Sequence, residues 1–219
     1  MSRMNNLNIF EALPQGFRFI ENGVERRLVA LTIAQAFADS AYPLPSCPIS
    51  HKDMLKLYFE LGLRWIDNAG KCGLVLTNDD FSGVLILTTM KDALDVEKII
   101  REDSTYDYLT PEARENLLYI FASHRKDEES LEYNDDDIYG EILAVQTPRQ
   151  GQKIASMLMR GMFAECDRVG KDIYLVTSPE KNIRIYEHYG YKIIKEMHIN
   201  EIDSHAFIMK RKCNAEFVN

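Results

Sequence analysis

The second half of this 219-residue chain alternates between strand-like and helix-like segments, and that order restricts the fold more than any other feature. Residues 138–145 and 172–177 are short β-rich runs, and residues 152–168 between them repeat apolar residues at three- and four-residue steps. A short helix over 181–188 and a hairpin of 191–199 with 205–210 follow. Because a helix connects the first two strands, they can lie parallel, whereas hairpin strands are antiparallel. The order predicts an α/β fold in which helices flank a mixed, mostly antiparallel central sheet.

The first half adds helices and one hairpin to this core. We expect helices over 25–40, 51–67 and 110–123, and an antiparallel hairpin of 73–77 with 82–88. In the first helix the apolar stripe is Leu28, Leu31, Ala34 and Ala38, and Ser50 is a suitable N-cap for the second. The acidic run over 126–137 is predicted to be a solvated loop, with a rim that attracts cations as the alternative.

Composition and length indicate a single globular domain over residues 1–219. Hydrophobic residues make up 46% of the chain, and a chain of this length buries enough apolar surface to need no disulfide or metal. Lys and Arg number 26 against 34 Asp and Glu, so the net charge is −8. This sign disfavours nucleic acid as a partner, because that affinity depends on basic side chains that neutralise phosphates, and it favours a cationic partner.

Neither a membrane segment nor a metal site is expected. No apolar run approaches the roughly 18 residues of a membrane span, and the first residues lack the apolar region of a signal peptide, so we expect a cytoplasmic protein. The four cysteines show no Cys-x-x-Cys pair and no zinc spacing, which predicts free thiols and no bound metal.

A strand, a turn and a helix start coincide at residues 143–158, and this arrangement suits an anion. The first turn of a helix has backbone N–H groups without an internal partner and the positive end of the helix dipole. Gly151 allows close backbone approach, and Lys153 adds a positive charge. The loop is neither a Walker A sequence nor a G-x-G-x-x-G sequence, and a glycine before a helix is by itself more often a simple turn.

Two motifs together resemble one family. The residues from Gln150 to Ala155 (QGQKIA) resemble the Q/R-x-x-G-x-G/A signature with which GNAT N-acetyltransferases bind the pyrophosphate of acyl-CoA. About thirty residues later, the run from Asn182 to Tyr191 (NIRIYEHYGY) resembles the N-x-x-x-x-Y-E-x-x-G-F segment of the same family. The resemblance covers residues 138–212 and departs from the signature at Lys153, which replaces the first glycine. Its side chain can crowd the pyrophosphate or pair with a phosphate, and the sequence leaves both open.

The resemblance implies that acetyl-CoA is the co-substrate and that the acetyl group moves to a primary amine of a small molecule or peptide by direct attack in a ternary complex. The implied cofactor-binding residues are Leu143, Ala144, Val145, Gln150, Gly151, Gln152, Lys153, Ile154, Ala155 and Asn182. The implied general acid is Tyr186, whose phenol is protonated at neutral pH. The alternative for Tyr186 is a core aromatic, and for Asn182 it is a helix N-cap.

Glu141 is the candidate general base. It precedes Val145 by four residues along the predicted strand, so we expect both side chains on one face. Some members of the family use a glutamate from this strand to accept the proton of the amine. The alternatives are a solvent-facing carboxylate or one paired with a lysine.

The N-terminal helices, within residues 1–70, are expected to form the wall of the acceptor site, with Tyr42, Tyr58 and Trp65 among its residues. The excess of acidic residues favours a cationic acceptor, and the resemblance implies a homodimer. The competing hypothesis is a non-catalytic acyl-CoA-binding or regulatory module with the same fold, which the lysine at position 153 keeps open.

Overall fold

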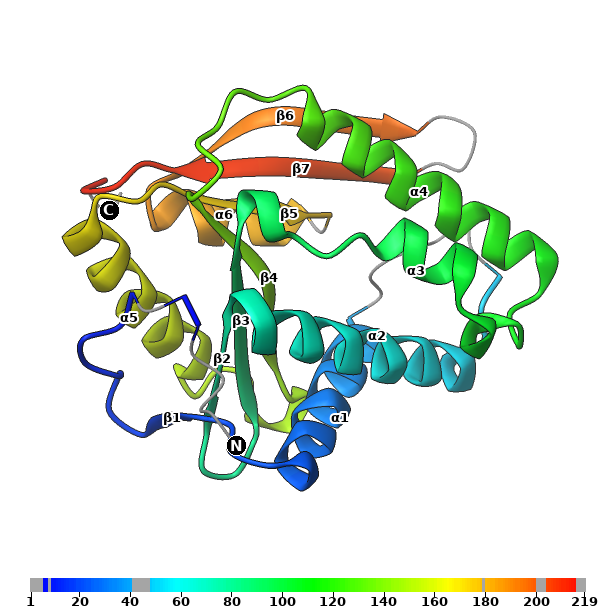
Figure 1. The fold of residues 1–219 in the computed structure, drawn as a ribbon, viewed down its shortest axis with the longest axis horizontal. Coiled ribbons are helices and arrows are strands. Elements are labelled where there is room, and N and C mark those ends of the chain that lie inside the picture. The colour runs from blue at the N-terminus through cyan, green and yellow to red at the C-terminus, as the bar shows by residue number, and fades with distance from the viewer. Residues whose placement is uncertain (1–5, 8, 41–47, 179, 200–203, 216–219) are drawn as a thin grey trace.

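The computed structural model describes residues 6–7, 9–40, 48–178, 180–199 and 204–215, and these form one sheet with helices on both faces (Figure 1). The strands are β1 (Phe17–Phe19), β2 (Leu74–Asn78), β3 (Gly83–Thr89), β4 (Ile138–Val145), β5 (Ile173–Thr177), β6 (Tyr191–Ile199) and β7 (Ser204–Arg211). The α-helices are α1 (Gly23–Asp39), α2 (His51–Cys72), α3 (Val96–Glu102), α4 (Pro111–Glu129), α5 (Ile154–Val169) and α6 (Glu180–His188). Short 3₁₀ turns are η1 (Met90–Asp92), η2 (Ser104–Tyr106) and η3 (Thr147–Arg149).

The sheet has the order β1-β2-β3-β4-β5-β7-β6. Only the β4–β5 pair is parallel, and α5 makes the crossover between these two strands. All other neighbours are antiparallel, including the expected hairpins β2–β3 and β6–β7. The predicted α/β class with a mixed, mostly antiparallel sheet is therefore confirmed. The sequence order did not indicate that β7 would lie between β5 and β6.

Helix starts follow the local sequence. The Asn22 side chain accepts hydrogen bonds from the first backbone N–H groups of α1, the Ser50 hydroxyl accepts one from Asp53 N, and the Thr110 hydroxyl caps α4 just before Pro111. The end of α4 differs from the prediction, because residues 126–129 continue the helix instead of starting a loop. An ion pair one turn apart, between Arg125 and Glu129 at 2.9 Å, stabilises this last turn.

The buried stripe of α1 agrees with the prediction only in part, because Ala34 and Ala38 are buried and the two predicted leucines are not. Leu28 and Leu31 are 38% and 45% exposed, whereas Val29, Ala30 and Ile33 are fully buried. The reason is close packing on α2, where a Cβ built on Gly62 would lie 3.4 Å from the Cα atom of Ala30. The small residues Gly62 and Ala30 permit this short approach, and the face of α1 around Ala30 is therefore buried while the two leucines lie outside it.

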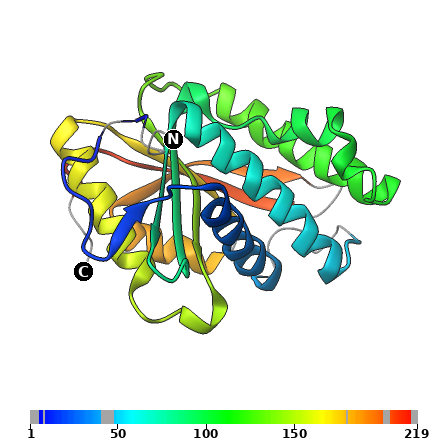
Figure 2. The ribbon, with the colours of Figure 1, turned by 60° about the horizontal axis from the view of Figure 1, so that its bottom comes forward.

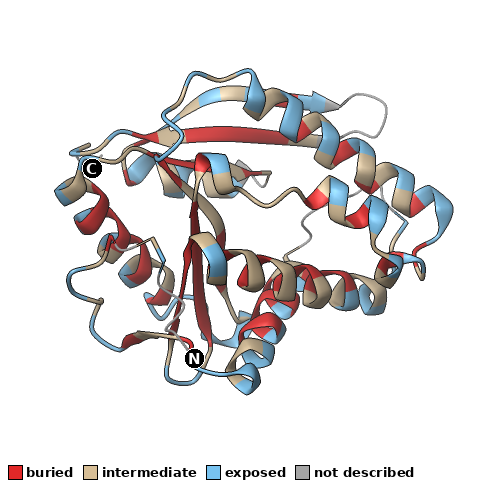
Figure 3. Ribbon diagram, viewed as in Figure 1, coloured by how far each residue is buried: buried red, intermediate tan, exposed pale blue. Residues whose placement is uncertain are grey.

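Two large apolar cores lie on opposite faces of the sheet, and a smaller cluster consists of Met197, Ala206 and Ile208 on β6 and β7. Helices α1 to α4 cover one face, and α5 and α6 cover the other (Figures 1 and 2). Residues of β3 alternate between the cores: Val84 and Ile86 pack under α1 to α4, and Leu85 and Leu87 pack under α5. The inner strands are buried on both faces, and the outer helix surfaces are exposed (Figure 3).

Candidate active site

Strands β4 and β5 separate in the middle of the sheet. They pair only at Ile138 with Ile173 and at Tyr139 with Tyr174, and from Gly140 onward the described residues record no pairing between them. A cavity of about 840 Å³ occupies this opening and is lined from β4 by residues 140–145 and from β5 by residues 175–178. The cavity therefore passes through the sheet and joins the two helical layers.

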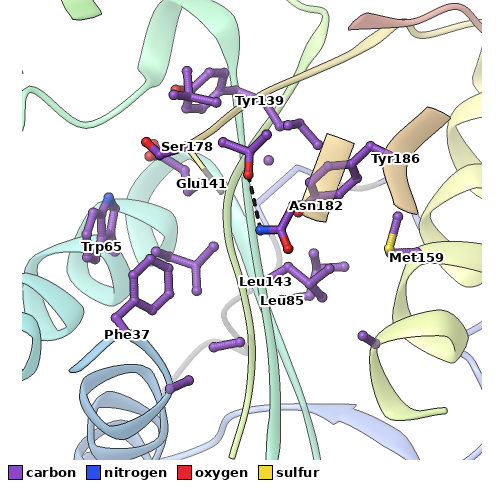
Figure 4. A pocket seen from close by; sticks show the side chains of 18 of the residues that line it. Phe37, Trp65, Leu85, Tyr139, Glu141, Leu143, Met159, Ser178, Asn182 and Tyr186 are labelled. Carbon is purple, nitrogen blue, oxygen red and sulfur yellow. Dashed lines mark hydrogen bonds between the residues drawn. The ribbon is translucent and has the colours of Figure 1, made fainter. Parts of the chain in front are cut away.

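Different residues line the two ends of the cavity. Trp65 and Phe37 lie on one side of β4, and Tyr186, Asn182 and Met159 lie on the other (Figure 4). We call the first the α1–α4 end and the second the α5–α6 end. Tyr58 and Trp65, predicted for the acceptor wall, both line the α1–α4 end, whereas Tyr42 lies outside the described residues.

The α5–α6 end reaches the first turn of α5. Gly151 has a φ of +79°, a conformation that glycine adopts without steric cost. Backbone pairing within α5 starts where Met157 N donates to Lys153 O at 2.9 Å, so the N–H groups of residues 154–156 precede the helical ladder. Ile154 and Ala155 line the cavity together with Gln150. This is the donor arrangement that an anionic group requires.

Lys153 shows why a glycine suits its position. Its φ is +66°, which puts a non-glycine residue in the left-handed region at a cost of roughly 1–2 kcal/mol. The side chain is exposed and lines the cavity. Gln152 is different: it is exposed, its side-chain amide donates to Pro148 O at 3.4 Å, and it does not line the cavity.

The charged residues that line the cavity are separated by sign. Five acidic side chains belong to the α1–α4 end, accompanied by two basic ones: Asp95, Glu97, Glu128, Glu129 and Glu141, with Lys91 and Arg125. The described lining of the α5–α6 end has three basic side chains and no acidic one: Arg149, Lys153 and Lys181. One end thus favours an anion and the other a cation.

A β-bulge reverses the expected side of Glu141. Ile86 pairs with Ile142 and Leu87 with Gly140, which leaves Glu141 as an extra residue in β4. Leu143 and Val145 pack toward α5, but Glu141 accepts hydrogen bonds on the opposite face. The prediction that Glu141 shares a face with Val145 is therefore wrong, because the inserted residue breaks the alternation on which it depended.

The Glu141 carboxylate is neither solvent-facing nor paired with a lysine. Its Oε1 accepts hydrogen bonds from the Thr88 hydroxyl at 3.0 Å and from Leu94 N at 2.8 Å. Burial raises the pKa of Glu141 from 4.5 to about 7, with a smaller rise from the nearby charge of Glu128, against the lowering effect of hydrogen bonds from Leu94, Thr88 and Trp65. The carboxyl group can therefore exchange a proton near neutral pH.

Tyr186 and Asn182 reach the cavity from α6. The Tyr186 ring packs at the edge of Tyr191, with centroids 5.4 Å apart, and burial raises the pKa of the Tyr186 phenol to about 12. The phenol is therefore protonated at neutral pH. Asn182 lies within α6, not before it, and its amide donates to the Thr177 hydroxyl at 3.2 Å, so the N-cap alternative is wrong.

A polar group on α4, formed by His124 and Glu128, was not predicted from the sequence. His124 and Glu128 both line the α1–α4 end, and Glu128 Oε1 accepts a hydrogen bond from the Tyr139 hydroxyl at 2.6 Å. Their four-residue spacing places them on one helical face, a signal hidden by the prediction of a loop from residue 126. Thr88 was also missed, because its relevance depends on the bulge.

The described residues offer neither a metal-binding cluster nor a membrane-spanning helix. They contain no cluster of three or more His, Cys, Asp or Glu side chains suited to a metal ion. None of their helices combines the length and the apolar character that crossing a membrane requires.

Solved structures resemble this chain, although no family profile and no curated protein sequence matches it. Arylalkylamine N-acetyltransferase 2 from Aedes aegypti superposes with a TM-score of 0.59 at 16% identity, over 91% of this chain and 100% of that one. The histone acetyltransferase HPA2 and related acetyltransferase from Corynebacterium glutamicum superposes with a TM-score of 0.57 at 14% identity, over 90% of this chain and 96% of that one. The C-terminal condensation domain of Ebony, in complex with beta-alanyl-dopamine, superposes with a TM-score of 0.55 at 10% identity, over 90% of this chain and 98% of that one.

Proposed function

From the premise that this chain has the fold of the GNAT acetyltransferases, we propose that it transfers an acetyl group from acetyl-CoA to a primary amine. The observation that carries the proposal is the charge separation in one continuous cavity. A polyanionic acyl donor suits the basic α5–α6 end, and a protonated amine suits the acidic α1–α4 end. The two meet where β4 and β5 diverge.

The residues at the α5–α6 end fit acetyl-CoA. The N–H groups that start α5, the left-handed turn at Gly151 and the charges of Lys153 and Lys181 suit its pyrophosphate. The edge of β4 from Leu143 to Val145 has no recorded pairing with β5, so backbone groups on this edge other than the Val145 carbonyl, which accepts from Gln150 Nε2 at 3.3 Å, can bind the amide groups of the pantetheine arm. When bound, acetyl-CoA supplies a thioester carbonyl for the amine to attack.

In the proposed reaction a C–N bond forms, the C–S bond breaks and two protons move. A neutral amine is required, and the Glu141 carboxylate, with a pKa of about 7, accepts the amine proton directly or through one water molecule. The Tyr186 phenol, with a pKa of about 12, donates its proton to the departing thiolate. These two groups approach the opening from the two different layers, as Figure 4 illustrates.

Calorimetry with CoA and a thiol-release assay with acetyl-CoA and a panel of amines test this proposal. We expect CoA to bind and at least one amine to release thiol. CoA binding without turnover on any amine would favour the non-catalytic acyl-CoA-binding module. Turnover without a requirement for acetyl-CoA would favour another reaction on the same fold, and the absence of CoA binding would overturn the proposal.

A matched pair of glycine variants localises the pyrophosphate. Gly151 and Gly170 both have positive φ, and a Cβ added to either would meet no atom within 4 Å, but they lie at opposite ends of α5. Alanine therefore imposes a similar backbone penalty at both. We expect Gly151→Ala to weaken CoA binding about tenfold and Gly170→Ala to leave it within twofold. Equal affinities would place the pyrophosphate elsewhere.

A further inference from the structure

The α1–α4 end holds a polar group that the proposed proton transfers do not use. His124 and Glu128 lie one turn apart on α4, and both line the cavity. His124 is only 7% exposed, and its Nε2 has no hydrogen-bond partner among the described residues. An unpartnered polar atom in a buried position is costly to the folded protein, and a ligand that completes its hydrogen bonding would account for its presence.

Glu128 has capacity for a further donor. The Tyr139 hydroxyl donates to its Oε1 at 2.6 Å, and a carboxylate can accept about four hydrogen bonds. Burial raises the pKa of Glu128, which means that its charge is incompletely compensated in the absence of a ligand. A cation placed beside it would favour the charged form of the carboxyl group.

The protein's own cations near this group are engaged elsewhere. The nearby positive charge of Arg125 lowers the pKa of Glu128, but its guanidinium contacts Asp95 at 2.6 Å and Glu129 at 2.9 Å. Glu141 and Glu128 meanwhile interact unfavourably, since the charge of Glu128 raises the pKa of Glu141. Two half-buried carboxylates in one cavity end can thus accommodate two positive charges.

We propose that the acceptor is a diamine, whose reacting amine lies at Glu141 while its distal ammonium group donates to Glu128 and the neutral imidazole of His124. This inference rests on the proposed function and narrows its substrate class. Aromatic side chains that line the same cavity, including Trp65, Phe121 and Tyr139, suit the alkyl linker and the cationic end.

The test compares diaminobutane, butylamine and aminobutanol as acceptors with saturating acetyl-CoA. For the unmodified protein we expect KM for diaminobutane about tenfold or more below KM for butylamine, since one charge-assisted hydrogen bond accounts for such a ratio. Glu128→Gln should remove most of this preference by raising KM for diaminobutane much more than KM for butylamine.

Two further variants separate recognition of the distal ammonium group from the effects of a charge change on α4 or of altered stability. Glu115→Gln makes the same charge change at an exposed position of α4 and should keep the preference. His124→Leu removes the unpartnered nitrogen, so we expect a higher melting temperature together with a weaker preference for diaminobutane. A merely structural role of His124 predicts the opposite change in melting temperature and no change in preference.

Failure of the diamine inference and failure of the proposed function would give different results. Equal KM values for diaminobutane and butylamine, or a Glu128→Gln variant that keeps the full preference, would overturn the diamine inference and leave amine acetylation intact. No transfer to any amine, or no binding of CoA, would overturn the proposed function and the inference with it.

Discussion

The Thr88 hydroxyl donates a 3.0 Å hydrogen bond to Glu141 Oε1 across the β3–β4 ladder, at the point where a bulge interrupts β4. Together with the bond from Leu94 N at 2.8 Å, it holds the carboxylate on the face covered by α1 to α4. Because the same carboxylate is buried, its pKa is about 7 and not near 4.5. The bulge therefore determines both the direction in which this group points and the pH range in which it exchanges a proton.

Replacing Glu141 by Gln should lower kcat/KM for the amine about a hundredfold or more, because the amine then lacks its proton acceptor. In the unmodified protein we expect kcat/KM to rise with pH through an apparent pKa near 7, as the carboxyl group loses its proton. Initial rates between pH 5 and pH 9 measure both effects. A variant that keeps this limb of the profile would exclude Glu141 as the base.

The same carboxyl group should make folding stability depend on pH. Its pKa is about 7 in the folded protein against an ordinary value of 4.5, so between these pH values the folded state holds a proton that the unfolded state has released. Stability must therefore decrease as pH rises from about 4.5 to about 7, by an amount on the order of 3 kcal/mol. Glu141→Gln should lack this contribution and be more stable than the unmodified protein at pH 8.

Urea unfolding at pH 5 and pH 8 tests this expectation. Burial lowers the pKa of His124 to about 4, so His124 makes the folded protein more stable as pH rises. Subtracting the free energy of unfolding of Glu141→Gln from that of the unmodified protein cancels this contribution, because both proteins contain His124. Glu115→Gln, an exposed charge change, serves as the control and should follow the unmodified protein at both pH values. A difference that is the same at pH 5 and pH 8 would contradict the assigned pKa.

Tyr186→Phe should reduce kcat by about a hundredfold while the Kd for CoA changes less than twofold, because the phenol proton is needed chiefly in the transition state. Tyr191→Phe is a matched control: the two rings are in contact, and the Tyr191 hydroxyl has no hydrogen-bond partner among the described residues. Steady-state rates and calorimetry supply the two readouts. A similar loss of kcat in both variants would point to packing of the rings and not to proton donation.

Lys153 offers a test in which backbone strain and charge are separable. Lys153→Ala removes the charge and keeps a Cβ at a φ of +66°, whereas Lys153→Gly removes both the charge and the strain. We expect the glycine variant to be about 1 kcal/mol more stable than the alanine variant. Both should bind CoA several-fold more weakly than the unmodified protein, and tighter binding by either would mean that the lysine crowds the pyrophosphate.

Local sequence signals account for much of this fold. Capping residues such as Asn22, Ser50 and Thr110 act within one helical turn, and the apolar periods of α2 and α5 depend on side chains a few residues apart. The crossover between β4 and β5 follows from a helix of sufficient length between two strands. Such features need no knowledge of distant partners.

Most of the departures arise from contacts between distant segments, whereas the additional last turn of α4 is stabilised locally by the ion pair between Arg125 and Glu129. Leu28 and Leu31 are exposed because the face of α1 that packs against the rest of the protein is the one that contains Val29, Ala30 and Ile33. The place of β7 between β5 and β6 depends on which edge of β5 is available.

The order of most elements, the mixed sheet and the turn at Gly151 could be predicted from the sequence, because each depends on neighbouring residues along the chain. The side of β4 on which Glu141 lies could not be predicted in this way. Nor could its hydrogen bond with Thr88, or the fact that it lines one cavity with His124 and Glu128. The physical reason is the bulge: one unpaired residue reverses the alternation of a strand, and whether it forms depends on the neighbouring strand and on the helices that cover it.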